Sequence, residues 1–132
     1  MHSNIRVAVG ILTRADTILV AQRPPNKPYS GYWEFPGGKI EAAESGETAV
    51  KRELAEELGI HVTAAALCFT HTHAYPDKTV LLEIWRITAF SGEPEGKENQ
   101  AVRWVSWPEM LALRLLEGNQ VIMSKIKEQA WP

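Results

Sequence analysis

Three glutamates, Glu53, Glu56 and Glu57, occupy positions i, i+3 and i+4 of a segment with helical periodicity. At about 3.6 residues per turn, this spacing places their carboxylates on one face of a helix. Like charges at this spacing repel one another, so the arrangement is unfavourable without a partner. Carboxylate oxygens are hard ligands that suit Mg²⁺ or Mn²⁺ better than zinc. The three glutamates alone therefore fit a divalent-metal site and a solvated acidic helix face equally well.

The residues that precede this helix favour the metal site. Pro36-Gly37-Gly38 interrupts an extended segment and allows the backbone to approach a ligand closely. Gly38 is followed after five residues by Glu44, and seven further residues lead to the run from Arg52 to Gly59. These spacings resemble the Nudix box, whose fixed glycine, glutamate, Arg-Glu, aliphatic, Glu-Glu and glycine positions are all met. So many fixed positions are very hard to meet by chance.

The resemblance to Nudix hydrolases implies a hydrolase of phosphorus anhydrides that uses Mg²⁺, with Mn²⁺ as a substitute. It also implies an α/β (α+β) fold, an α/β/α sandwich with a mixed β-sheet between helices. Glu53 and Glu98 are the candidates for the general base, and Arg52 is expected to orient carboxylates by pairing with Glu44. An exposed loop glutamate is the alternative for Glu98. The expected metal ligands are the Gly37 carbonyl, Glu53, Glu56, Glu57 and Glu98.

Segments outside the box are similar to MutT-like 8-oxo-dGTP diphosphatases, which release the nucleoside monophosphate and pyrophosphate. They include residues 9–11, 33–41, 75–78 and 119–122, so that the likeness covers nearly the whole chain. A nucleoside triphosphate is therefore the expected partner. The resemblance implies substrate contacts at Arg23, Glu34, Phe35, Pro36, Gly37, Gly38, Lys39, Lys78 and Asn119.

Asn119 is the residue expected to read the base. Its amide carries a donor and an acceptor, which match O6 and the N7–H that 8-oxidation creates on guanine. The alternatives are a helix N-cap for Asn119, a core position for Phe35, and solvated surface cations for Arg23 and Lys78. Two departures from the MutT pattern concern the base and phosphate contacts: Gln120 replaces a usual proline, and Lys78 stands in place of an arginine.

Two other functions compete with hydrolysis of 8-oxo-dGTP. One is a MutT-like pyrophosphohydrolase for CTP or modified cytidine nucleotides, against which Asn119 is the main argument. The other is a nucleotide-sensing Nudix module that does not cut its ligand. Such modules often lose glutamates of the box, whereas Glu53, Glu56 and Glu57 are all present.

Hydrophobic periodicity predicts the elements that must hold these residues. The central prediction is a helix over residues 45–58, with Ser45 as N-cap and Gly59 as a left-handed stop. A short helix is expected to begin at Ser106, and a last helix near Asn119. Strands are expected over residues 5–12, 18–21, 32–35, 67–74, 79–90 and 102–105.

The 132 residues are predicted to form one domain, residues 1–132. The net charge of −2 provides no strong field for nucleic acid or anionic membranes, so neither is an expected partner. A monomer is expected. Cys68 is the only cysteine, and the residues after Met1 lack a basic region followed by an apolar run. A cytoplasmic location without a signal peptide is therefore predicted.

Overall fold

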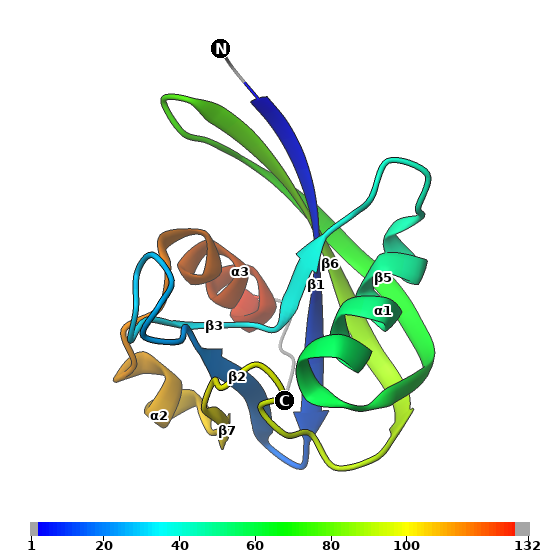
Figure 1. The fold of residues 1–132 in the computed structure, drawn as a ribbon. Coiled ribbons are helices and arrows are strands. Elements are labelled where there is room, and N and C mark those ends of the chain that lie inside the picture. The colour runs from blue at the N-terminus through cyan, green and yellow to red at the C-terminus, as the bar shows by residue number, and fades with distance from the viewer. Residues whose placement is uncertain (1–2, 129–132) are drawn as a thin grey trace.

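The computed structural model describes residues 3–128 and contains a mixed β-sheet with helices on both faces (Figure 1). The strand order is β3-β2-β1-β6-β5, with β4 added to β1 and β7 added to β2. Strand β1 runs parallel to β6 and antiparallel to β2 and β4. The predicted sandwich with a mixed sheet is therefore confirmed. The elements are β1 (Ser3–Arg14), β2 (Thr17–Gln22), β3 (Trp33–Glu34), β4 (Gly37–Lys39), α1 (Gly46–Leu58), β5 (His61–Ala74), β6 (Lys78–Ser91), β7 (Val102–Val105), α2 (Trp107–Leu111) and α3 (Glu117–Glu128).

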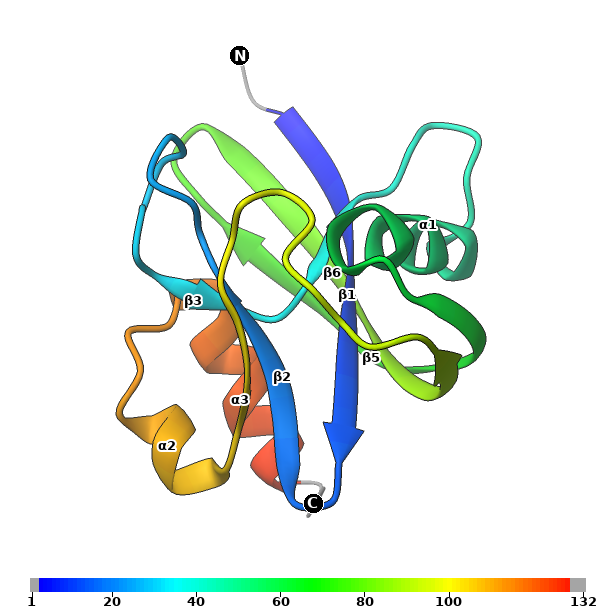
Figure 2. The same cartoon turned by 60° about the horizontal axis from the view of Figure 1, so that its bottom comes forward.

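Strand β1 separates two hydrophobic cores, because its successive side chains point to opposite faces of the sheet. Ala8 and Leu12 pack into the core beneath α1, whereas Val9 and Ile11 pack into the core beneath α2 and α3. Figure 2 shows α1 on one side of β1 and the other two helices on the far side. Apolar residues at positions i, i+4 and i+8 of α1 form a stripe that is fully buried: Val50, Leu54 and Leu58.

Both predicted ends of α1 are confirmed. The Ser45 hydroxyl accepts a hydrogen bond from the Thr48 N–H, and Gly59 has a φ of 71° while its N–H donates to the Ala55 carbonyl. Glycine suits that position because other residues rarely adopt a left-handed backbone. The short helix predicted at Ser106 is also present, and it begins with a capping box in which Glu109 is the second member. None of the helices within residues 3–128 is long and apolar enough to cross a membrane.

Several element boundaries differ from the predictions, most of all the start of β5. Strand β5 begins at His61 rather than Leu67, because pairing with β6 extends the ladder through an alanine-rich stretch that lacks alternation. The ladder is irregular there, with register shifts typical of β-bulges. Helix α3 begins at Glu117 rather than near Asn119, since the Gln120 N–H already donates to the Leu116 carbonyl.

Candidate active site

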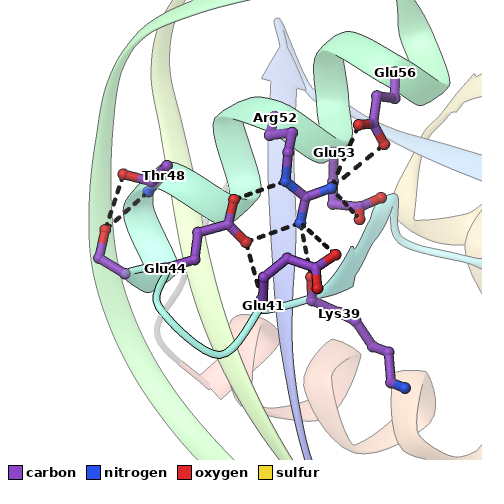
Figure 3. Close-up of polar contacts among 8 residues, drawn as sticks. Lys39, Glu41, Glu44, Thr48, Arg52, Glu53 and Glu56 are labelled. Carbon is purple, nitrogen blue, oxygen red and sulfur yellow. Dashed lines mark hydrogen bonds and ion pairs between the residues drawn. The ribbon is translucent and has the colours of Figure 1, made fainter.

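Arg52 lies at the centre of a carboxylate network that joins α1 to the preceding loop (Figure 3). Its Nε donates to Glu44 Oε2 over 2.7 Å and its Nη2 to Glu44 Oε1 over 2.9 Å, so the predicted pairing is present. Its Nη1 donates to Glu53 Oε1 over 2.9 Å and lies 3.4 Å from Glu56 Oε2. The hydrogen bond from Arg52 lowers the pKa of Glu44 to about 2. The two-point contact between Arg52 and Glu44 fixes the preceding loop to α1.

The Glu53 carboxylate occupies the space beside the Gly38 backbone. A Cβ built on Gly38 would overlap this carboxylate, so the close approach requires glycine. Burial raises the pKa of Glu53, and the hydrogen bond from Arg52 opposes that rise. Arg52 also donates to the Lys39 carbonyl over 3.0 Å, whereas the Lys39 ammonium extends away from this network (Figure 3). Lys39 therefore contributes its backbone here.

Glu57 is held by the backbone of the same loop. The Gly37 N–H donates to Glu57 Oε2 over 3.0 Å. A Cβ on Gly37 would overlap the Ala8 carbonyl oxygen, so only glycine fits between β1 and this carboxylate. Burial raises the pKa of Glu57 to about 8 even though the Gly37 hydrogen bond acts to lower it. Nearby carboxylates add to the rise: Glu34, Glu53 and Glu98.

Glu98 lies on the loop between β6 and β7 and is exposed. Its N–H donates to Gln100, whose amide in turn donates to the Glu57 carbonyl. The fold therefore brings Glu98 close to the acidic face of α1, the face that carries Glu53, Glu56 and Glu57. The charge of Glu98 accordingly raises the pKa of both Glu53 and Glu57. Glu56 is exposed at the edge of that face and contacts Arg52. A bound divalent cation would relieve the mutual repulsion of these carboxylates. Their oxygen atoms therefore form a set of donors that fits such an ion.

The carboxylates are nevertheless engaged with protein partners. Within residues 3–128, no three His, Cys, Asp or Glu side chains lie close enough together to hold a metal ion. Glu53 is turned toward Arg52, and Glu57 toward the Gly37 N–H. Sharing one ion would therefore require these side chains to rotate away from their present partners.

A cavity of about 820 Å³ is lined by three of the predicted substrate contacts, Arg23, Lys78 and Asn119. Arg23 Nη1 lies 3.3 Å from Glu34 Oε1, and its Nε donates to the Pro28 carbonyl over 2.6 Å. Burial raises the pKa of Glu34, opposed by the Arg23 charge. Arg23 therefore joins the wall of the cavity to Glu34.

Asn119 faces the cavity and is held by one hydrogen bond from the main chain. The Phe35 N–H donates to Asn119 Oδ1 over 2.9 Å. Asn119 is not the N-cap of α3, because the helix begins at Glu117. The Phe35 ring is only 3% exposed and packs in the core beneath α3, so the alternative of a core position holds for its side chain. Pro36 serves the fold through its carbonyl, which accepts from the Gly10 N–H over 2.8 Å.

Several residues of this region escaped sequence reasoning. Three tyrosines line the cavity, namely Tyr29, Tyr32 and Tyr75. Tyr75 belongs to the MutT-like segment 75–78 but was not expected to line a cavity; the Lys78 ammonium lies 5.3 Å from the centre of its ring. Gln100 was also missed, although it is one of the few buried polar side chains among the described residues. Tyrosine and glutamine give no signal of their own in a single sequence, because neither has a fixed spacing from the box.

Comparison with known proteins decides the family. The NUDIX domain model matches residues 4–126. This chain belongs to the NUDIX family. As a Nudix hydrolase it is an enzyme that acts on phosphorus anhydrides, and enzymes of this family generally need a divalent metal ion.

This Nudix hydrolase is similar to two curated Escherichia coli enzymes. It is 39% identical to a CTP pyrophosphohydrolase over 107 residues, covering 81% of this chain and 79% of the relative. It is 35% identical to an 8-oxo-dGTP diphosphatase over 124 residues, covering 93% of this chain and 96% of the relative. A solved structure from work on MutT of Aliivibrio salmonicida and Vibrio cholerae superposes with a TM-score of 0.81 at 34% identity, covering 96% of this chain and 99% of that one.

Proposed function

We propose that this Nudix hydrolase converts 8-oxo-dGTP to 8-oxo-dGMP and pyrophosphate with Mg²⁺, and so removes an oxidised nucleotide from the DNA precursor pool. The observation that most supports 8-oxo-dGTP as the substrate is the Asn119 amide, which lies at the wall of the cavity and is oriented by the Phe35 N–H. Similarity to a curated 8-oxo-dGTP diphosphatase over 93% of this chain supports the same substrate.

The orientation of the Asn119 amide provides a physical basis for choosing the oxidised base. Because Oδ1 accepts from Phe35, rotation of the amide would lose that hydrogen bond. Oδ1 keeps a second lone pair for an N7–H, and Nδ2 keeps its donors for O6. Normal guanine presents a lone pair at N7, which would face the lone pair of Oδ1. Leaving a buried polar group unpaired in this way is a strong means of rejecting an analogue.

The chemistry is assigned to the acidic face of α1 and its surroundings. Bound Mg²⁺ would neutralise phosphate charge and polarise the phosphoryl oxygens. The ligands that would hold it are the Gly37 carbonyl, Glu53, Glu56, Glu57 and Glu98. Glu53 or Glu98 would accept a proton from the attacking water, and Arg52 with Glu44 would keep the carboxylates in place.

The remaining contacts concern the sugar and phosphates. Arg23 and Lys78 line the cavity from two different segments, so their charges can meet the sugar–phosphate part of a nucleotide. The Phe35 N–H donates to Asn119 at the cavity wall and the Gly37 N–H donates to Glu57, so the backbone between them joins the cavity to the acidic face. A phosphate chain would therefore extend along that backbone toward Glu53 and Glu57.

CTP, or a modified cytidine nucleotide, is the second candidate substrate. It is favoured by the 39% identity to a CTP pyrophosphohydrolase over most of both chains. An asparagine amide can also pair with a pyrimidine edge, since cytosine presents both donors and acceptors. Gln120, where MutT-like sequences usually have proline, lines the same cavity and changes its wall.

Steady-state kinetics with Mg²⁺ on 8-oxo-dGTP, dGTP and CTP would test the proposal. A kcat/KM for 8-oxo-dGTP well above the other two is the expected result. Preference for CTP would replace it with the second candidate. Failure to hydrolyse any nucleotide, with binding retained, would indicate a nucleotide-sensing module.

A further inference from the structure

Gln100 is a buried side chain whose amide uses both of its ends. It is 9% exposed and lies on the loop between β6 and β7. Its Nε2 donates to the Glu57 carbonyl over 3.1 Å, and its Oε1 accepts from the Glu98 N–H over 2.7 Å. One side chain therefore bridges the last turn of α1 and the backbone of Glu98.

The surrounding loop is fixed to the same end of the helix. The last carbonyls of a helix have no partner within it and must be satisfied from outside. The Lys97 N–H donates to the Glu57 carbonyl over 2.9 Å, and the Glu95 N–H donates to the Leu58 carbonyl over 3.0 Å. At Gly96, a Cβ would overlap the Gln100 carbonyl oxygen, so the loop closes tightly on itself. The chain around Glu98 is thus attached to α1 on both sides.

Glutamine is the residue type that these contacts require. One end must donate to a carbonyl while the other accepts from an N–H, and an amide offers both. An apolar residue of similar size would fill the space but leave the Glu98 N–H without its acceptor. Glutamate would keep the acceptor and place a second acceptor opposite the Glu57 carbonyl. A residue that has the shape of Gln100 but lacks its amide donor and acceptor therefore cannot replace it.

We propose that Gln100 is a positioning residue, which holds the Glu98 backbone beside Glu57 and so delivers the exposed Glu98 carboxylate to the acidic face of α1. The inference rests on the role in hydrolysis proposed above for Glu98. Gln100 itself does not touch the reacting atoms. Its effect on the reaction passes through the placement of Glu98, and the cavity that holds Asn119 is independent of it, since Gln100 does not line that cavity.

A double-mutant cycle separates positioning from a general structural role. The variants are Gln100→Leu, Glu98→Gln and the pair, assayed with Mg²⁺ on the preferred nucleotide. Gln100→Leu is expected to lower kcat by roughly ten- to a hundredfold, as small displacements of catalytic groups do, with KM within about twofold. In the Glu98→Gln background the same change is expected to have little further effect. Gln22→Leu is the matched control, because it removes a side-chain bond to the Gly31 carbonyl without touching Glu57 or Glu98.

The outcomes are distinguishable. If Gln100→Leu lowers kcat equally in the wild-type and Glu98→Gln backgrounds, the positioning role is overturned. The proposed function is left intact by that result. A normal kcat for Glu98→Gln would remove Glu98 from the reaction and the inference with it. If the leucine variant does not fold, Gln100→Glu gives the same cycle, and a loss of kcat that persists unchanged in the Glu98→Gln background would again overturn the proposal.

Discussion

Replacing Glu57 with glutamine should stabilise the metal-free protein at alkaline pH. The Glu57 carboxyl has a pKa of about 8, raised chiefly by burial from an ordinary value of 4.5. Below pH 4.5 the carboxyl is protonated in both the folded and unfolded states. Between pH 4.5 and about 8, only the folded state retains the proton, so stability falls as pH rises. Above about pH 8 the folded protein has lost all of the stability that depends on protonated Glu57.

The size of this effect follows from the interval. At about 1.36 kcal/mol per pH unit, the span from 4.5 to about 8 corresponds to a loss of roughly 4 to 5 kcal/mol. This is a large share of the roughly 5–15 kcal/mol by which a typical domain is stable. Glutamine resembles the protonated carboxyl: it is neutral, has nearly the same shape, and keeps an oxygen to accept from the Gly37 N–H.

Urea unfolding in EDTA at several pH values from about 5 to 9 would measure this effect. The two proteins should be almost equally stable at the acidic end, and the variant should become the more stable one as pH rises. With Mg²⁺ present, the same variant should lose turnover, because one of the proposed metal ligands is missing. A difference in unfolding free energy that stays constant with pH would show that Glu57 titrates normally and would refute the argument from burial.

Three further perturbations test other parts of the site. Gly38→Ala should lower kcat by about a hundredfold, because the added Cβ overlaps the Glu53 carboxylate; wild-type kinetics would show that Glu53 does not need its present place. Asn119→Ala removes the Oδ1 acceptor that would distinguish an N7–H from an N7 lone pair, so the ratio of kcat/KM for 8-oxo-dGTP over dGTP should narrow by about tenfold; an unchanged ratio would leave Asn119 a structural role only. Removal of divalent metal with EDTA should abolish turnover and Mg²⁺ should restore it, as activity assays before and after dialysis would check; turnover that survives EDTA would contradict the metal-dependent assignment.

The helix that carries the glutamates could be predicted closely, because its signals are local. Ser45, the apolar stripe and Gly59 each act within a few residues, and each holds in the structure. The pairing of Arg52 with Glu44 could also be predicted, since the box places them at a fixed separation.

Contacts that depend on tertiary packing could not be predicted from the sequence. Asn119 looked like a helix cap or a base contact, and only the approach of the Phe35 N–H across the fold shows how its amide is oriented. Gln100 gave no local signal, because its two partners come from the end of α1 and from its own loop. The early start of β5 likewise depends on its pairing with β6, which overrides the weak strand preference of its alanines.

Residues 35–37 connect the site proposed for the base with the site proposed for hydrolysis of the phosphate chain. The Phe35 N–H holds the residue assigned to the base, and the Gly37 N–H, two residues on, holds Glu57 at the hydrolytic end. Between them, Pro36 has no N–H to offer, and its carbonyl is fastened to Gly10 in the central strand. In the proposed binding mode, the separation between the base and the scissile bond would therefore be set by two peptide units of main chain. Such an arrangement would favour nucleotides whose distance from base to scissile phosphate matches this spacing.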